Sequence, residues 1–253
     1  MHLLARNSQI FVIFCCHFPV WMSIITEQKV YQMIKQSELA YNMLKEAEGA
    51  VSAKLLEAKG VSNETLRRLV KKGVAEKVAA GHYALSGRID ILHSDWVAFS
   101  LQVPRGVIGL LTAATYHDIT QELCAYHQAF VPRTRANNIT LGGDSGAKFE
   151  TVSSRNDDYL DIGVDTITLS GTPIRITSKE RTLLDLFIFS PFNSSTTDAS
   201  ARIPEETFLD ALARCADDAD FSFDRFHELA NKFGCSSKVT PFTKTLRFGA
   251  NNM

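Results

Sequence analysis

Positively charged side chains gather in one stretch of the chain, residues 52–82. This stretch holds seven lysines and arginines against three glutamates, a charge of +4 in a chain whose formal net charge is −1. Lysine and arginine neutralise DNA phosphates, and arginine also recognises guanine edges in the major groove. The chemistry that this stretch predicts is therefore recognition of double-stranded DNA.

Two short helices are expected to position these side chains. Ser52 is predicted to cap the first helix and Gly60 to end it, because glycine readily adopts the left-handed conformation after a helix. Its expected inward-facing residues are Ala53, Leu55, Leu56 and Ala58. Ser62 is predicted to cap the second helix, which buries Leu66, Leu69 and Val70 on one face.

The exposed side of the second helix is predicted to be basic. At 100° per residue, Glu64, Arg68 and Lys71 point directly away from the buried face. The residues expected on its flanks are Thr65, Arg67 and Lys72. An alternative stays open, because a basic helix face is often only a solvated surface and Glu64 with Arg68 forms an ordinary i,i+4 pair.

A small hairpin is expected to follow, with strands at 74–78 and 82–85. Helix, turn, basic helix and hairpin is the order of elements in a winged helix-turn-helix, whose second helix lies in the major groove. The side chains predicted to contact DNA are Ser52, Lys54, Ser62, Asn63, Thr65, Arg67, Arg68, Lys71, Lys72, Lys77, His82 and Tyr83.

The whole chain is long enough for two units. It has 253 residues, of which 45% are hydrophobic, and its halves differ in charge, +5 for residues 1–88 and −6 for 89–253. We expect an α+β protein with an N-terminal extension and lead-in helix at 1–36, a winged helix-turn-helix domain at 37–88 and a mixed α/β domain at 89–253. Basic residues are expected to meet DNA, in an arrangement that suits a homodimer.

The N-terminal segment is predicted to be neither a membrane span nor a signal peptide. Its apolar run, residues 10–22, is shorter than the roughly 20 residues that cross a bilayer, and no small-x-small cleavage site follows. The natural start is expected at Met22 or Met33 rather than at Met1. Five cysteines without a CxxC pair indicate a reduced, cytoplasmic protein without a metal site, and the histidines are scattered in sequence.

The second half is expected to mix short strands with helices. The predicted helices are 94–102, 108–117, 205–215, 223–233 and one opening at Ser178, and the predicted strands are 126–131, 148–152, 160–162, 166–169 and 174–176. Residues 190–200 are expected to form a loop, and Pro241 to lie in a last short segment. Arg181 and Asp185 lie four apart on the helix from Ser178, which favours a structural ion pair over a partner contact.

Enzyme chemistry is not predicted. No Gly-x-Ser-x-Gly, Walker or Gly-x-Gly-x-x-Gly motif occurs. A nuclease would need a late strand with paired acidic residues, and a nucleotidyltransferase would need carboxylates two apart after Gly142-Gly143, where Asp158 and Asp161 are three apart. We therefore expect a protein without catalytic activity or cofactor.

Three runs carry a resemblance to a known family: GVSNETLRRLVKKG with Gly81-His82-Tyr83 after it, GVIGLLTAATYHDIT, and GTPIRITSKERTLLDLF. They resemble AbiEi-type antitoxins of abortive-infection, or type IV, toxin–antitoxin systems, over residues 37–233. The most specific run holds Ser178, Arg181, Thr182, Leu183 and Asp185.

The resemblance implies a winged helix-turn-helix that represses its own operon at inverted repeats. It also implies a C-terminal domain, with Arg181, Thr182 and Asp185 in its signature run, that opposes a nucleotidyltransferase toxin without a stable complex. This chain departs from the family in its long N-terminus. It also differs at residues 109–112, where relatives often carry a more polar Ser/His lead into the helix. Two alternatives stay open: a protein-interaction module that acts on the toxin directly, and a stand-alone regulator without a toxin.

Overall fold

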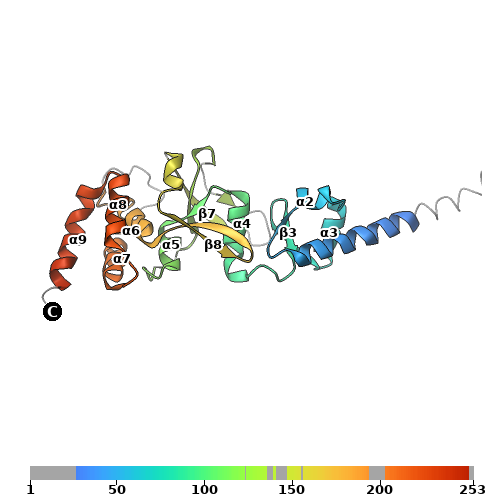
Figure 1. The fold of residues 1–253 in the computed structure, drawn as a ribbon, viewed down its shortest axis with the longest axis horizontal. Coiled ribbons are helices and arrows are strands. Elements are labelled where there is room, and N and C mark those ends of the chain that lie inside the picture. Colours follow the sequence, from blue (N-terminus) through green and yellow to red (C-terminus); the bar gives the residue numbers. More distant parts are fainter. Residues whose placement is uncertain are drawn as a thin grey trace, which may run out of the picture. The chain divides into compact units, whose positions relative to one another are not determined.

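The computed structural model describes residues 27–122, 124–135, 139–140, 147–154, 156–193 and 203–250. The chain divides into two compact units, the first made of residues up to Lys77 together with Gly81–Arg88, and the second of Val78–Ala80 together with the residues from Ile89 onward. Each unit contains helices and a sheet of its own, so the fold is α+β (Figure 1). The apolar run at 10–22, Gly142-Gly143 and the loop from 194 to 200 lie outside the described residues.

Three helices and a three-stranded sheet enclose the core of the first unit. A long N-terminal helix occupies residues 27–46. After it come β1 (Val51–Ser52), α2 (Ala53–Ala58), α3 (Asn63–Lys71), β2 (Ala75–Ala79) and β3 (His82–Leu85). The strand order is β1-β3-β2, and Val51 of β1 lies opposite Tyr83 of β3. The core joins Ala40 and Leu44 of the N-terminal helix to Leu56, Leu66 and Leu69.

Local sequence signals placed α2 and α3 correctly. The Ser52 and Ser62 hydroxyls accept hydrogen bonds from the Leu55 and Thr65 amides, as N-caps should. The inward orientation predicted for Leu55 and Ala58 is wrong, because both are exposed and only Leu56 of the six-residue α2 is fully buried. The boundary predicted at residues 36 and 37, between the lead-in helix and the winged domain, does not separate two helices, because one helix runs through residues 27–46.

The second unit is built on a mixed six-stranded sheet. Its strands are β4 (Val107–Ile108), β5 (His127–Val131), β6 (Ile139–Thr140), β7 (Lys148–Ser153), β8 (Val164–Leu169) and β9 (Thr172–Thr177). The order is β6-β7-β5-β4-β9-β8, with β4 parallel to β9 and β5 parallel to β7. The strands β8 and β9 form an antiparallel hairpin with Ile167 opposite Ile174.

Helices bury much of the second unit's apolar surface. They are α4 (Ser94–Gln102), α5 (Leu110–Tyr116), α6 (Lys179–Ile188), α7 (Glu205–Asp217), α8 (Phe223–Lys232) and α9 (Ser236–Ala250). Helix α6 packs against α5, α7 and α8, and Figure 1 draws α6 to α9 gathered at one end of the sheet. The resulting core contains Leu183, Leu184 and Phe187 of α6 together with Phe208 and Phe226.

Three predicted elements of the second unit differ from the structure. Residues 157–160 form a 3-10 helix, η3 (Asp157–Leu160), where a strand was predicted at 160–162. The helix predicted from 108 begins at Leu110, because Val107 and Ile108 pair in the sheet as β4. Pro241 lies inside α9, not in a short irregular segment. Within the described residues, no helix is long and apolar enough to cross a membrane.

Candidate nucleic-acid interface

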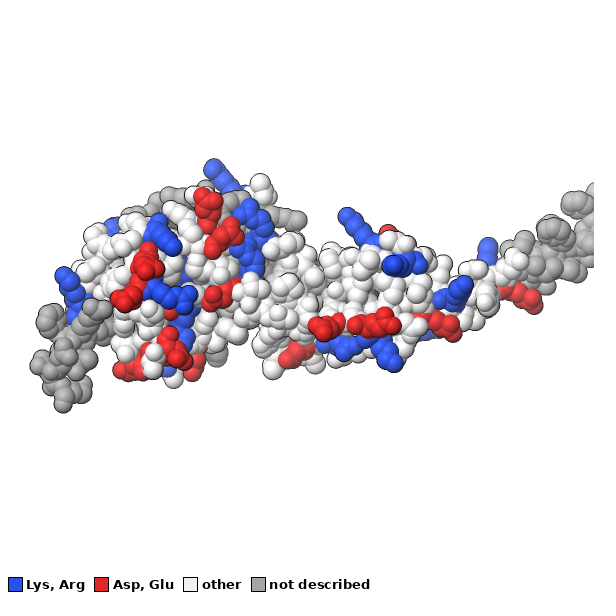
Figure 2. All heavy atoms as spheres, in the orientation of Figure 1, with Lys and Arg blue, Asp and Glu red and all other residues white. Residues whose placement is uncertain are grey.

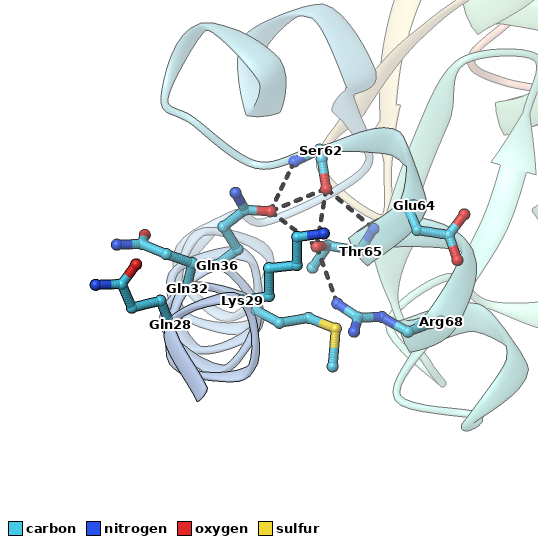
Figure 3. Close-up of a pocket in the computed structure, with 9 residues that line it drawn as sticks. Gln28, Lys29, Gln32, Gln36, Ser62, Glu64, Thr65 and Arg68 are labelled. Atoms are coloured by element: carbon cyan, nitrogen blue, oxygen red, sulfur yellow. Dashed lines mark hydrogen bonds between the residues drawn. The ribbon is translucent and has the colours of Figure 1, made fainter. Parts of the chain in front are cut away.

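The start of α3 is locked by a glutamine from the N-terminal helix. The Gln36 Oε1 atom accepts hydrogen bonds from the Ser62 amide at 3.3 Å, the Ser62 hydroxyl at 2.9 Å and the Thr65 hydroxyl at 2.9 Å. Figure 3 shows these three bonds converging on one oxygen. The orientation of α3 therefore depends on a residue 26 positions before its N-cap.

Arg68 does not point away from the unit as predicted. Its Nη2 donates to the Thr65 hydroxyl at 3.1 Å, and its Nε is buried without a hydrogen-bond partner among the described residues (Figure 3). Thr65 is only 1% exposed, so its predicted position on an exposed flank is also wrong. The cause is Gln36. Its side-chain oxygen accepts a hydrogen bond from the Thr65 hydroxyl, which in turn accepts one from Arg68, so both side chains lie towards the N-terminal helix.

The exposed face of α3 is instead centred on Glu64, Arg67 and Lys71. All three are exposed, and the positions follow a spacing of three and four residues along one side of the helix. Asn63 is exposed too, but its amide donates to the Glu57 carboxylate on α2. Two cations, Arg67 and Lys71, are thus presented by a helix whose opposite face is anchored in the core.

The other residues predicted to contact DNA are either exposed to solvent or engaged in the structure of the first unit itself. The side chains of Lys54, Lys72 and Lys77 are exposed, the last on β2 of the hairpin. Ser52 and Ser62 act as helix caps, and Tyr83 is half-buried against the core of the first unit. His82 is half-buried and its backbone pairs with Ser52. The residues that remain available to a ligand are the lysines and Arg67.

An open groove borders α3 on the side of the N-terminal helix. Its volume is about 450 Å³, and its walls come from Lys29, Gln32 and Gln36 on one helix and Glu64 and Arg68 on the other (Figure 3). The sequence offered no signal for this groove, because its two walls are about 30 residues apart in the chain. Polar amides and charges of both signs line it.

We expect Gln36→Ala to destabilise the first unit. The substitution leaves three donors, the Ser62 amide and the Ser62 and Thr65 hydroxyls, without their acceptor. Net hydrogen bonds contribute about 0.5–1.5 kcal/mol each, so the loss should be about 1.5–4.5 kcal/mol. Gln32→Ala, one turn away and exposed, is the matched control and should change stability by less than about 0.5 kcal/mol. Chemical denaturation followed by circular dichroism measures both. Equal stability of the two variants would contradict the proposed lock.

Charge alone does not define the interface. On the face drawn in Figure 2, basic and acidic side chains lie next to one another in both units. The excess of positive charge in residues 52–82 therefore belongs to particular helix and hairpin positions and does not form one continuous patch on that face.

The three residues predicted for the second unit form part of its core. Arg181, Thr182 and Asp185 are 3%, 0% and 1% exposed. The Arg181 Nε donates to Asp185 Oδ1 at 2.8 Å, Arg181 Nη1 donates to the carbonyls of Tyr159 and Ile162, and its guanidinium lies 4.0 Å from the centre of the Phe233 ring. The preferred interpretation of the pair as a structural anchor agrees with this geometry.

Burial governs the ionisation of this pair. It raises the pKa of the Asp185 carboxyl to about 6, while the charge and hydrogen bond of Arg181 act in the opposite direction. At neutral pH the carboxyl is therefore predominantly ionised beside the guanidinium. Thr182, the residue after Arg181, shares a hydroxyl–hydroxyl contact of 2.7 Å with Thr177 at the end of β9.

A cluster that the sequence did not reveal lies between α4 and β5. The Trp96 Nε1 donates to His127 Nδ1 at 3.4 Å, and His127 Nε2 is 3.6 Å from Asp95 Oδ2. The ring of His93 packs against Trp96, so two histidines described above as scattered meet at one tryptophan. Burial lowers the pKa of His127, which favours the neutral ring that accepts from Trp96.

The pocket beside this cluster does not hold an activated thiol. It measures about 380 Å³ and is lined by Asp95, Cys124, His127 and Lys148 among others. Burial, with help from Glu150 and Glu122, raises the pKa of Cys124 to about 11. The thiol is therefore protonated at neutral pH, and a nucleophilic cysteine needs the opposite shift. Among the residues that the structure describes, no three metal-binding side chains come together.

Comparison with models of protein families gives no match. Comparison with curated proteins gives none either. Among solved structures, the chain is similar to the crystal structure of the RV2827C protein from Mycobacterium tuberculosis, with a TM-score of 0.48 and 12% sequence identity. The similarity covers 78% of this chain and 71% of that one.

Proposed function

We propose that the first unit binds double-stranded DNA as a winged helix-turn-helix, with α3 in the major groove and the β2–β3 hairpin as the wing. The observation that carries the proposal is the geometry of α3, whose buried face is fixed by Leu66, Leu69 and the Gln36 lock while Arg67 and Lys71 are exposed. A rigid helix that presents cations opposite its core is suited to the major groove. Lys77 on the adjacent hairpin would add a phosphate contact.

The biological role that we propose is that of a repressor without catalytic activity. By the resemblance of its sequence runs, the protein would act as an AbiEi-type antitoxin that represses its own operon at inverted repeats. Its second unit would counteract a nucleotidyltransferase toxin. What supports this extension is the signature run of α6, which forms the packed centre of the second unit. A nucleotidyltransferase gene beside the gene for this protein would support it further.

The double substitution Arg67→Ala/Lys71→Ala should weaken binding to a DNA fragment from the protein's own promoter. Loss of base contacts costs about 1–3 kcal/mol each, and loss of phosphate contacts also flattens the dependence of affinity on salt. Fluorescence anisotropy between about 50 and 200 mM salt measures both effects. Both residues are exposed, so folding should be unaffected.

The matched control for this experiment is Lys232→Ala/Lys244→Ala, which removes two exposed cations from the second unit. We expect the control to keep wild-type affinity. If the two double variants bind the promoter equally well, α3 is not the DNA-binding element. Arg68→Ala should weaken binding less than Arg67→Ala, because Arg68 is held by Thr65.

A further inference from the structure

One side of the N-terminal helix carries apolar side chains that the first unit leaves uncovered. Val30, Ile34 and Tyr41 are 45%, 52% and 39% exposed. Their spacing of four and seven residues places them in one stripe along the helix. The buried side of the same helix, at Ala40 and Leu44, lies about 80° around the axis at 100° per residue. The stripe is thus separate from the face that holds the helix in its own unit.

The stripe begins with an acidic residue and ends with a basic one. Glu27 and Lys45 are both exposed, and they are separated by five full turns, which puts them on the same side of the helix beside the stripe. Along the axis they are about 27 Å apart, too far for an ion pair within one chain. Each end therefore carries an exposed charge whose complement lies at the other end.

We infer that this stripe, defined by Val30, Ile34 and Tyr41, is an interface between two copies of the chain, with their N-terminal helices antiparallel. In that arrangement Val30 packs against Tyr41 of the partner subunit, and Ile34 lies near the two-fold axis. Glu27 then meets Lys45 of the partner subunit, and the same contact recurs at the other end by symmetry.

Charge selects the antiparallel direction over the parallel one. Parallel helices would bring Glu27 against Glu27 of the partner subunit, and Lys45 against Lys45 of the partner subunit. Like charges repel across an interface. The occupant of the stripe is therefore another copy of the same helix, whose exposed apolar side chains and oppositely charged ends are complementary to it. Figure 1 shows that the N-terminal part of the helix extends past α3, and residues 27–35 are exposed. No residue assigned to DNA lies in the stripe, so the inference is independent of DNA binding.

Zero-length carbodiimide cross-linking of the full-length protein tests the inference directly. The reagent joins a carboxylate to an amine in contact, and Glu27 and Lys45 of one helix are too far apart to react with each other. A cross-linked peptide pair containing both residues, found by mass spectrometry in the band of twice the monomer mass, is the expected result. Sedimentation equilibrium should give a concentration-dependent dimer, and a protein that stays monomeric at all concentrations would overturn the inference.

Substitutions on the helix separate the stripe from a general effect. Ile34→Asp should weaken dimerisation by about tenfold or more, since it buries a charge at the interface. Leu39→Asp is the matched control, because Leu39 is 38% exposed but lies on the opposite side of the helix, and it should leave the dimer intact. Glu27→Lys and Lys45→Glu should each weaken the dimer, and the double variant should restore it. Failure of the double variant to recover would refute the antiparallel pairing.

Discussion

Replacing Asp185 by alanine should lower the free energy of unfolding of the second unit by about 3–5 kcal/mol, because it leaves a buried guanidinium without its counter-charge. Arg181 cannot move its charge into solvent, since its Nη1 is held by the Tyr159 and Ile162 carbonyls and Phe233 covers it. The effect would be much smaller if the pair were exposed, because solvent screens surface ion pairs. The 1% exposure of Asp185 removes that condition.

The chain contains its own control for this experiment. Asp210 and Arg214 form a second i,i+4 pair, with an Nε–Oδ2 distance of 2.9 Å. The Asp210 side chain, however, is 52% exposed. Asp210→Ala should cost only about 0.3–0.5 kcal/mol because solvent screens the pair. Urea unfolding followed by the fluorescence of Trp96, in a Trp21→Phe background, compares the two. Similar losses from both variants would contradict the assignment of Arg181–Asp185 as a buried anchor.

Leu184→Ala should destabilise the second unit by about 2–5 kcal/mol by leaving a cavity in its core. Leu184 is fully buried among the helices that pack on α6. Because the first unit has a separate core, amide hydrogen exchange should rise in peptides after residue 89 and stay unchanged in peptides from 27 to 88. Leu209→Ala, at a leucine that is 44% exposed, is the control and should leave both units protected.

The same variant tests the proposed antitoxin role. On co-expression with the proposed nucleotidyltransferase partner, cells carrying Leu184→Ala should lose protection from the toxin while binding to promoter DNA is kept. Protection by Leu184→Ala equal to that of the wild-type protein, despite an unfolded second unit, would place neutralisation in the first unit. Repression of the operon alone would then explain it.

Much of the secondary structure follows from short-range sequence signals. Ser52, Ser62 and Ser178 each cap a helix by accepting from an amide three residues later, a pattern complete within one turn. Strand positions in the second half were also predicted closely, for example 166–169 within β8 and 174–176 within β9. The strand order was not, because β4 pairs with β9 across 68 residues and nothing local encodes that pairing.

What the sequence by itself determined is the position of the basic helix and of the signature run of α6, since both depend on caps and periodicity within a few residues. What only the tertiary structure decided is which of their side chains face solvent. Gln36, 29 residues before Thr65, holds Thr65 and through it Arg68 towards the interior. The backbone carbonyls of Tyr159 and Ile162, which precede β8, hold Arg181 in the interior of the second unit. Helical spacing fixes the angle of a side chain about its own axis, whereas its burial depends on which distant segment packs there, and that is set by the fold.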